Sequence, residues 1–274
     1  MPIEYAMKYA SKCDERFSLA SVTEAAVNHD YDWEGVSTVK VYSVPVVALN
    51  NYAPMGANRY GSASELGNSA RSLTLSQDKA FTFTIDRRAA DDTEGAMHAG
   101  RALRREIDEV IVPTVDAYRL GVMASGAGTK ATGVTPTAAT AYQAFLAGPA
   151  ALMEAKAPAG GRVLFCTPAF YNLLKQDQSF MKAGDLSQRM LVTGSLGQVD
   201  GVNVVPVPAS YLPEGANFLL CHPLATVAPV KLESYKVHID PPGLSGTLVE
   251  GRVRYDAFVL DNKKNGIYYC SSAA

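Results

Sequence analysis

The chain has 274 residues, with 25 Lys and Arg against 27 Asp and Glu and a formal net charge of −2. Because 47% of the residues are hydrophobic and 19% are charged, the composition is globular and excludes an intrinsically disordered protein. The near-neutral charge excludes a protein that binds nucleic acid or membranes mainly through a strongly basic surface.

Targeting signals and disulfides are not expected from the sequence. The apolar runs are shorter than the roughly 20 residues of a membrane helix, and the N-terminus has neither the apolar region nor the cleavage site of a secretory signal. The four cysteines are scattered, without a CxxC pair. We therefore expect free thiols in a reducing cytoplasm at Cys13, Cys166, Cys221 and Cys270.

The N-terminal third is predicted to be an arm followed by a hairpin. Residues 1–30 indicate an arm with a short helix. Residues 36–49 are rich in valine and predict a strand, with Pro45 at an edge or a bulge. In residues 71–86, apolar and polar side chains alternate, which predicts either a second strand pair or one long bulged strand. Since an isolated hairpin is only marginally stable in water, we expect this one to pack on another subunit.

Residues 92–122 have the clearest helical pattern in the chain. Apolar side chains recur at helical spacing, and acidic residues with a threonine stand where the helix begins. Pro113 is expected to kink the helix, because proline lacks the N–H that would complete the hydrogen-bond ladder.

A cluster of charged side chains lies on this helix. Arg104 with Asp108 and Arg105 with Glu109 are spaced for ion pairs within the helix, and Arg101 lies one turn earlier. Two interpretations stay open: a solvated helix face, or a face that pairs with another subunit or turns toward nucleic acid.

The second half of the chain has an α/β pattern. Residues 124–137 are rich in Gly, Thr and Ala and indicate a linker or flexible loop. Residues 261–266 end in Asn-Gly, a strong hairpin-turn signal. The predicted helices and strands are, in order, a helix at about 138–156, a strand at 162–167, a helix at 168–176, and strands at 189–193, 199–207, 217–222, 225–239, 247–260 and 267–270.

The sequence predicts no catalytic, cofactor-binding or metal-binding residues. The segment around Ser195 lacks the first glycine of a GxSxG nucleophile elbow in register. His29, His98, His222 and His238 have no metal-ligand spacing. The chain offers no nucleophile with an adjacent base.

Several stretches, taken together in this order, resemble a known family. Residues 32–43 and 81–88 look like the strands of an extended loop, and residues 100–119 look like a long helix called the spine. Residues 228–233 and 255–268 look like the tail. The combination resembles the major capsid protein of tailed bacteriophages, with the Hong Kong 97-type fold, over nearly the whole chain.

The resemblance implies an α+β fold in four parts. These are an N-terminal arm, an extended β-hairpin loop, a peripheral domain with the spine helix and the C-terminal strands, and an α/β axial domain. Their implied ranges are 1–30 for the arm, 31–90 for the loop, 91–136 with 241–274 for the peripheral domain, and 137–240 for the axial domain.

The resemblance also implies a structural protein and not an enzyme. Such a chain self-assembles through pentamers and hexamers into an icosahedral shell around phage double-stranded DNA, without sequence-specific DNA binding. The implied partners are further copies, a portal and a separate scaffolding protein, since the chain starts at Met1 without a long charged prosegment. The implied place is the virion, with assembly in the host cytoplasm and without a membrane or cofactor.

Two alternatives stay open beside the phage shell. An encapsulin-type compartment would keep the fold and add a groove for a cargo peptide between the arm and the peripheral domain. A hydrolase of the α/β region would need a base and an acid arranged around Ser195. For the capsid reading, the candidate intersubunit contacts are Arg101, Arg104, Arg105, Asp108, Glu109, Arg59, Tyr60, Phe81 and Phe83.

Charge reversal tests the arginine cluster. If Arg104 and Arg105 form ion pairs between subunits, the double variant Arg104→Glu, Arg105→Glu impairs assembly more than folding. The measurement compares particle yield by electron microscopy with the melting temperature of the subunit. Particles that form normally would show that the cluster is only a solvated face.

Overall fold

The chain folds into two compact units. The computed structural model describes residues 21–28, 38–43, 47–55, 58–63, 65, 67, 69–87, 99–177 and 197–273. Residues 30–75 form one unit, here called the hairpin unit, and residues 1–29 with 76–274 form the main unit. Predictions that fall on other residues, such as the arm before residue 21 and a strand at 189–193, lie outside the described residues.

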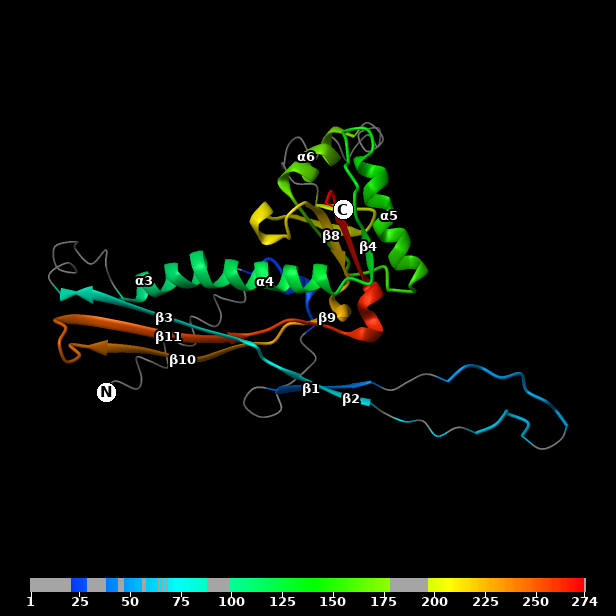
Figure 1. Ribbon diagram of the computed structural model, residues 1–274, viewed down its shortest axis with the longest axis horizontal. Helices are drawn as coiled ribbons and strands as arrows, with labels where there is room; N and C mark the ends of the chain where they lie inside the picture. Colours follow the sequence, from blue (N-terminus) through cyan, green and yellow to red (C-terminus); the bar gives the residue numbers. More distant parts are fainter. Residues whose placement is uncertain are drawn as a thin grey trace. The chain divides into compact units, whose positions relative to one another are not determined.

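A six-stranded sheet forms one half of the main unit (Figure 1), in the order β4-β13-β8-β5-β7-β6. Neighbouring strands are parallel in the β4–β13 and β5–β7 pairs and antiparallel in the others. The strands are β4 (Thr129–Ala131), β5 (Val163–Cys166), β6 (Gln198–Val199), β7 (Val202–Pro206), β8 (Ala216–Cys221) and β13 (Ile267–Ser271).

Both faces of this sheet are covered. Leu164 of β5 and Leu220 of β8 contact α5 (Ala141–Glu154) and α6 (Pro168–Gln176). Leu219 of β8 lies on the opposite face, in a cluster with α4 and residues 26–27. Since successive side chains of a strand point to opposite faces, the short apolar runs that predicted these strands are buried on both sides.

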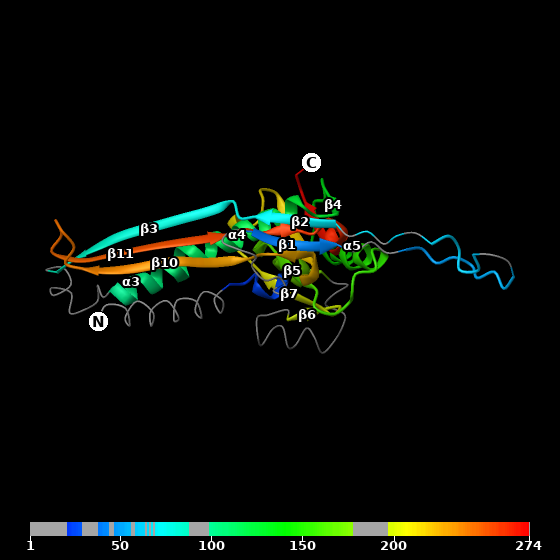
Figure 2. The same ribbon diagram turned by 90° about the horizontal axis from the view of Figure 1, so that it is seen from below.

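A three-stranded antiparallel sheet forms the other half, in the order β10-β11-β3. Its strands are β3 (Gln77–Asp86), β10 (Val230–Ile239) and β11 (Gly246–Tyr255). They run side by side along the long helix (Figures 1 and 2). Val249 and Val253 are buried, whereas Glu250 and Arg252 between them are exposed. Buried and exposed side chains alternate here, and the strand that the sequence predicted at 247–260 is confirmed as β11.

The long helix is built from three consecutive segments: α3 (Ala99–Glu106), the π-helical turn η2 (Ile107–Ile111) and α4 (Val112–Ser125). Pro113 lies in the first turn of α4, directly after the π-helical turn. A proline at this position has no N–H for the α-helical ladder, and a wider turn before it absorbs the missing bond. The predicted helix is confirmed from residue 99 onward, and its expected irregularity is a π-helical turn.

The stretch 124–137, predicted to be a linker or a flexible loop, connects α4 to α5 and contains a short strand. Strand β4 lies within it and pairs in parallel with β13. The Gly128 amide donates to the Lys264 carbonyl at 2.9 Å, and a Cβ at Gly128 would lie only 2.7 Å from the Asn265 nitrogen. Gly128 therefore allows two backbone segments to pack closely.

The prediction of a hairpin turn at 261–266 is wrong. These residues form the 3-10 helix η5 (Asp261–Gly266), and β13 then pairs with β8 and β4 rather than with the preceding strand. The expected boundaries shift accordingly. The last strand, which we assigned to the part with the long helix, belongs to the six-stranded sheet, and β10, which we assigned to the other part, belongs to the three-stranded sheet.

Short elements connect the two sheets. Strand β9 pairs with β12 in a two-stranded sheet, directly after η4. The bounds are η1 (Glu24–Ala26), η3 (Ala209–Tyr211), η4 (Pro223–Ala225), β9 (Thr226–Val227) and β12 (Phe258–Val259).

Within the described residues of the hairpin unit, two strands form one pair. Strands β1 (Thr38–Ser43) and β2 (Ser69–Thr74) are antiparallel, with Thr38 opposite Thr74. The alternating stretch 71–86 is thus split between two sheets, because β3 begins at Gln77 and pairs with β11 of the main unit. The hairpin unit ends at Leu75, whereas the extended loop was expected over 31–90.

Two glycine substitutions should have opposite effects on stability. Gly128→Ala places a Cβ against the Asn265 backbone and should cost about 1–3 kcal/mol as an overpacked contact. Gly121→Ala lies within α4 with nothing within 4 Å of its Cβ, and should stabilise the helix by about 0.5–1 kcal/mol. Thermal unfolding of the subunit measures both. A Gly128→Ala variant as stable as the wild type would contradict the close-packing explanation.

Candidate functional site

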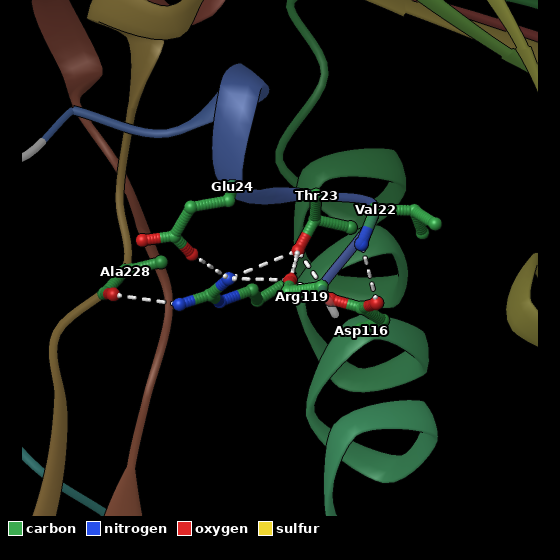
Figure 3. Close-up of polar contacts among 7 residues, drawn as sticks. Val22, Thr23, Glu24, Asp116, Arg119 and Ala228 are labelled. Atoms are coloured by element: carbon green, nitrogen blue, oxygen red, sulfur yellow. Dashed lines mark hydrogen bonds and ion pairs between the residues drawn. The ribbon is translucent and has the colours of Figure 1, made fainter. Parts of the chain in front are cut away.

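The N-terminal segment, residues 21–28, lies against α4 through a set of polar contacts (Figure 3). On α4, Asp116 and Arg119 are three residues apart and therefore share a face of the helix. Both are almost completely buried, at 1% and 2% exposure. A buried carboxylate and guanidinium require partners, and the N-terminal segment supplies most of them.

Asp116 is the acceptor for the N-terminal segment. Its Oδ1 accepts hydrogen bonds from Ser21 Oγ at 2.5 Å and Thr23 Oγ1 at 2.6 Å. Its Oδ2 accepts from the Val22 amide at 3.0 Å. Three donors on one carboxylate hold residues 21–23 in place.

Arg119 is the donor. Its Nη1 donates to Thr23 Oγ1 and Glu24 Oε2, each at 3.0 Å, and to Ser21 Oγ at 3.3 Å. Its Nη2 donates to the Ala228 carbonyl at 3.2 Å. We call Ser21, Thr23, Glu24, Asp116 and Arg119 the polar clasp. Removing one partner of a buried ion pair costs on the order of 3–5 kcal/mol.

The residues that flank the hairpin unit are both fixed within the main unit. On the entry side, the Asn28 amide donates to the Thr226 carbonyl at 2.8 Å. On the exit side, the Ser76 amide donates to Asp256 Oδ2 at 2.7 Å. Asp256 Oδ1 also accepts from the Tyr118 hydroxyl at 2.8 Å. Burial raises the pKa of Tyr118, so its hydroxyl stays a donor at neutral pH.

The hairpin unit exposes a run of large apolar side chains. Tyr52 and Tyr60 meet edge to face, with ring centroids 5.1 Å apart. The Ala53 amide donates to the Arg59 carbonyl at 3.0 Å, which ties the two sides of the loop together. The exposed set is Val47 (60%), Leu49 (101%), Tyr52 (53%), Met55 (87%) and Tyr60 (83%). The candidate contact residues Arg59 and Tyr60 lie in this run.

The predicted charged cluster lies along the start of the long helix. The pair Arg105–Glu109 is confirmed, with Nε and Oε1 3.0 Å apart and both side chains largely exposed. Arg104 is exposed and Asp108 is half-buried. The side chain of Arg101 lies outside the described residues.

The two candidate phenylalanines pack within their own chain. Phe81 and Phe83 of β3 are half-buried in the cluster between the three-stranded sheet and the long helix, with Leu103 and Ile107. A Cβ at Gly251 on the neighbouring strand would lie 2.2 Å from the Phe81 ring. The glycine at 251 therefore leaves space that the Phe81 ring occupies.

Sequence reasoning missed the clasp and Asp256. A signal was present, since Asp116 and Arg119 interrupt an apolar helix face formed by residues such as Val115, Leu120 and Met123. Charged side chains on a buried face usually have partners. The partners, however, lie more than 90 residues away in the sequence.

The described thiols are free and buried. Burial raises the pKa of Cys166 and that of Cys221 to about 12, and it also raises the pKa of Cys270. The expectation of free thiols is confirmed for these three. Cys13 lies outside the described residues.

Other sites can be assessed only in the described part of the chain. Within it, no three His, Cys, Asp or Glu side chains gather as a metal site, and no helix is long and apolar enough to cross a membrane. Ser195, His29 and His98 lie outside the described residues.

The described elements form a mixed α+β chain whose hairpin unit exposes large apolar side chains. The family follows from the sequence, because residues 71–269 match the family model for phage capsid protein. This match covers well over half of the chain, and the chain belongs to the phage capsid protein family.

Solved structures share the fold. A chain of Mycobacterium phage Che8 matches with a TM-score of 0.64 and 19% identity, over 87% of this chain and 86% of that chain. The capsid of cyanophage P-SCSP1u matches with a TM-score of 0.66 and 13% identity, over 88% and 85%. A virus-like particle from Pyrococcus furiosus matches with a TM-score of 0.59 and 12% identity, over 98% and 100%. No curated protein matches the sequence.

His222 should make the subunit less stable below neutral pH. Its Nδ1 accepts from the Leu224 amide at 3.2 Å, and its Nε2 lies 3.1 Å from the Gly160 carbonyl, as a neutral ring requires. Burial lowers the pKa of His222. The unfolded chain therefore takes up the proton more readily, and stability falls as pH drops below about 6.5.

The measurement is the melting temperature at pH 7.5 and 5.5. The melting temperature should fall more between pH 7.5 and pH 5.5 for the wild type than for His222→Asn, which keeps an acceptor for the Leu224 amide. The control His238→Asn replaces an exposed histidine whose Nε2 lies 3.4 Å from Glu250 Oε2; it leaves the contacts of His222 intact, so it should not show the smaller fall expected of His222→Asn. Equal falls in wild type and His222→Asn would contradict the explanation.

Proposed function

We propose that the chain is the major capsid protein of a tailed phage, assembling through pentamers and hexamers into an icosahedral shell around double-stranded DNA. The observation that carries the proposal is the run of exposed apolar side chains in the hairpin unit between residues 47 and 60. Family membership supports the shell, and the hairpin supports the way in which subunits join.

The exposed apolar side chains of this run would be stabilised by a surface that buries them. Leu49 and Met55 are almost fully exposed, at 101% and 87%, and burying one such side chain contributes about 1.5–3 kcal/mol. The strands of the hairpin span only six residues each, which is little support for an isolated hairpin. Contiguous exposed apolar surface marks interaction sites. In a shell made of copies of one chain, a neighbouring copy supplies the surface that buries these side chains.

Charged residues supply further proposed contacts between subunits. Arg105 and Glu109 are exposed on the long helix although they pair with each other, and Arg104 beside them is exposed as well. Arg59 is a proposed contact of the same kind in the hairpin unit. Many weak contacts of this kind suit a closed symmetric shell better than one strong site.

The charge balance supports the proposed contents of the shell. A net charge of −2 favours an inner wall that encloses DNA without binding it tightly. The proposed partners are a portal and a separate scaffolding protein, and the proposed place of assembly is the host cytoplasm.

A compartment shell is the second candidate. The virus-like particle from Pyrococcus furiosus matches over nearly the whole of both chains, so the same fold supports a closed particle of another kind. The contents of purified particles separate the two: double-stranded DNA supports the phage shell, and a protein cargo supports the compartment.

Loss of the apolar run should abolish assembly without unfolding the subunit. Wild-type chain, expressed alone or with a phage scaffold, should give shells or capsomer rings in sedimentation velocity and electron microscopy. The double variant Leu49→Asp, Met55→Asp should need at least about tenfold more protein to assemble. Its melting temperature as a subunit should equal that of the wild type.

A matched control carries the same added charge. Asn51 and Ser62 are exposed polar residues of the same unit, so Asn51→Asp, Ser62→Asp adds two carboxylates and removes no apolar surface. This control should assemble like the wild type. If the Leu49→Asp, Met55→Asp variant assembles at the wild-type concentration, a neighbour does not cover the hairpin.

A further inference from the structure

We propose that a single turn of α4, residues 116–119, positions both points where the chain leaves and re-enters the main unit around the hairpin unit. We further propose that the entry point, held by the polar clasp, is the releasable one. This inference rests on the proposed function, because the placement of the hairpin matters only where it meets a neighbouring copy.

The entry point is linked to α4 by sequence proximity. The clasp holds residues 21–24, and the Asn28 amide donates to the Thr226 carbonyl four residues later. Residues 30–75 form the hairpin unit directly beyond this point. Asp116 and Arg119 therefore determine where the chain departs.

The exit point is linked to α4 by Tyr118. Its hydroxyl donates to Asp256, and Asp256 accepts from the amide of Ser76, the first residue of the main unit after the hairpin. The Tyr118 ring meets the Tyr255 ring edge to face, with centroids 5.4 Å apart. Tyr118 also packs against the buried cluster that contains Val115 and Val253. Apolar burial thus supports the exit.

The entry depends on polar contacts instead. In the N-terminal segment the buried apolar side chains are the small ones of Ala26 and Val27, while Val22 is 38% exposed. The docking then rests largely on the hydrogen bonds to Asp116 and Arg119. Each of these bonds involves a charged group and contributes about 1.5–3 kcal/mol net. Water can take the place of each partner once the segment leaves, whereas it does not compensate apolar surface that becomes exposed, which makes the entry the releasable point.

The test removes one hydroxyl of the clasp and keeps both charges. Thr23→Val preserves the shape of the side chain but loses the donor to Asp116 and the acceptor for Arg119. Thr23→Ser retains the hydroxyl and should behave as the wild type. The matched control is Thr114→Val, which removes an exposed hydroxyl that donates to the Val110 carbonyl on the same helix.

Hydrogen exchange on the unassembled chain is the first measurement. In Thr23→Val, the amides of Val22 and Asn28 should exchange at least tenfold faster, while the amides of Ser76 and Leu219 keep their wild-type rates. Thr23→Ser and Thr114→Val should match the wild type at all four. An unchanged Asn28 rate, or an equal acceleration at Ser76, overturns the proposal.

Assembly is the second measurement, at a temperature where all variants are folded. Thr23→Val should give fewer or misshapen shells than Thr114→Val and Thr23→Ser. Wild-type yield and geometry in Thr23→Val would overturn the positioning role. If the wild type itself forms no particles with a phage scaffold, the proposed function fails, whereas the exchange rates still decide whether the clasp controls the entry point.

Discussion

The packing of one continuous helix, residues 99–125, against two sheets is the constraint on which the main unit depends. Val112 and Val115 lie in clusters with the three-stranded sheet, and Leu120 and Met123 lie in the cluster with the six-stranded sheet. One rigid element therefore fixes both sheets. The π-helical turn ahead of Pro113 lets the helix continue past a residue that would otherwise break its ladder.

Polar residues on the same helix determine where other segments of the chain attach to it. Apolar side chains are non-directional and accept many arrangements, whereas a buried carboxylate or guanidinium is satisfied only by donors and acceptors at set positions. Asp116 and Arg119 specify where residues 21–24 lie, and Tyr118 with Asp256 specifies where β3 begins. The helix thus serves as a core element on one side and as an attachment site on another.

The two units differ in how their apolar side chains are satisfied. The main unit buries most of its large apolar side chains, on both faces of one sheet and on one face of the other. The hairpin unit leaves a run of large side chains from Val47 to Tyr60 exposed. For a member of the phage capsid protein family, this difference is physically useful. Apolar surface that stays exposed in the single subunit can be buried when copies associate, and that burial favours the assembled state.

The sequence by itself determined the elements whose signals are local. The strand β11, the short apolar runs of β5 and β8, and the helix α6 were predicted from the sequence because hydrophobic periodicity acts within a few residues. Only the tertiary structure decided that Gly128 packs against Asn265, that β13 joins the six-stranded sheet and that Arg119 is buried. Each of these depends on a partner far along the chain, which no local pattern encodes.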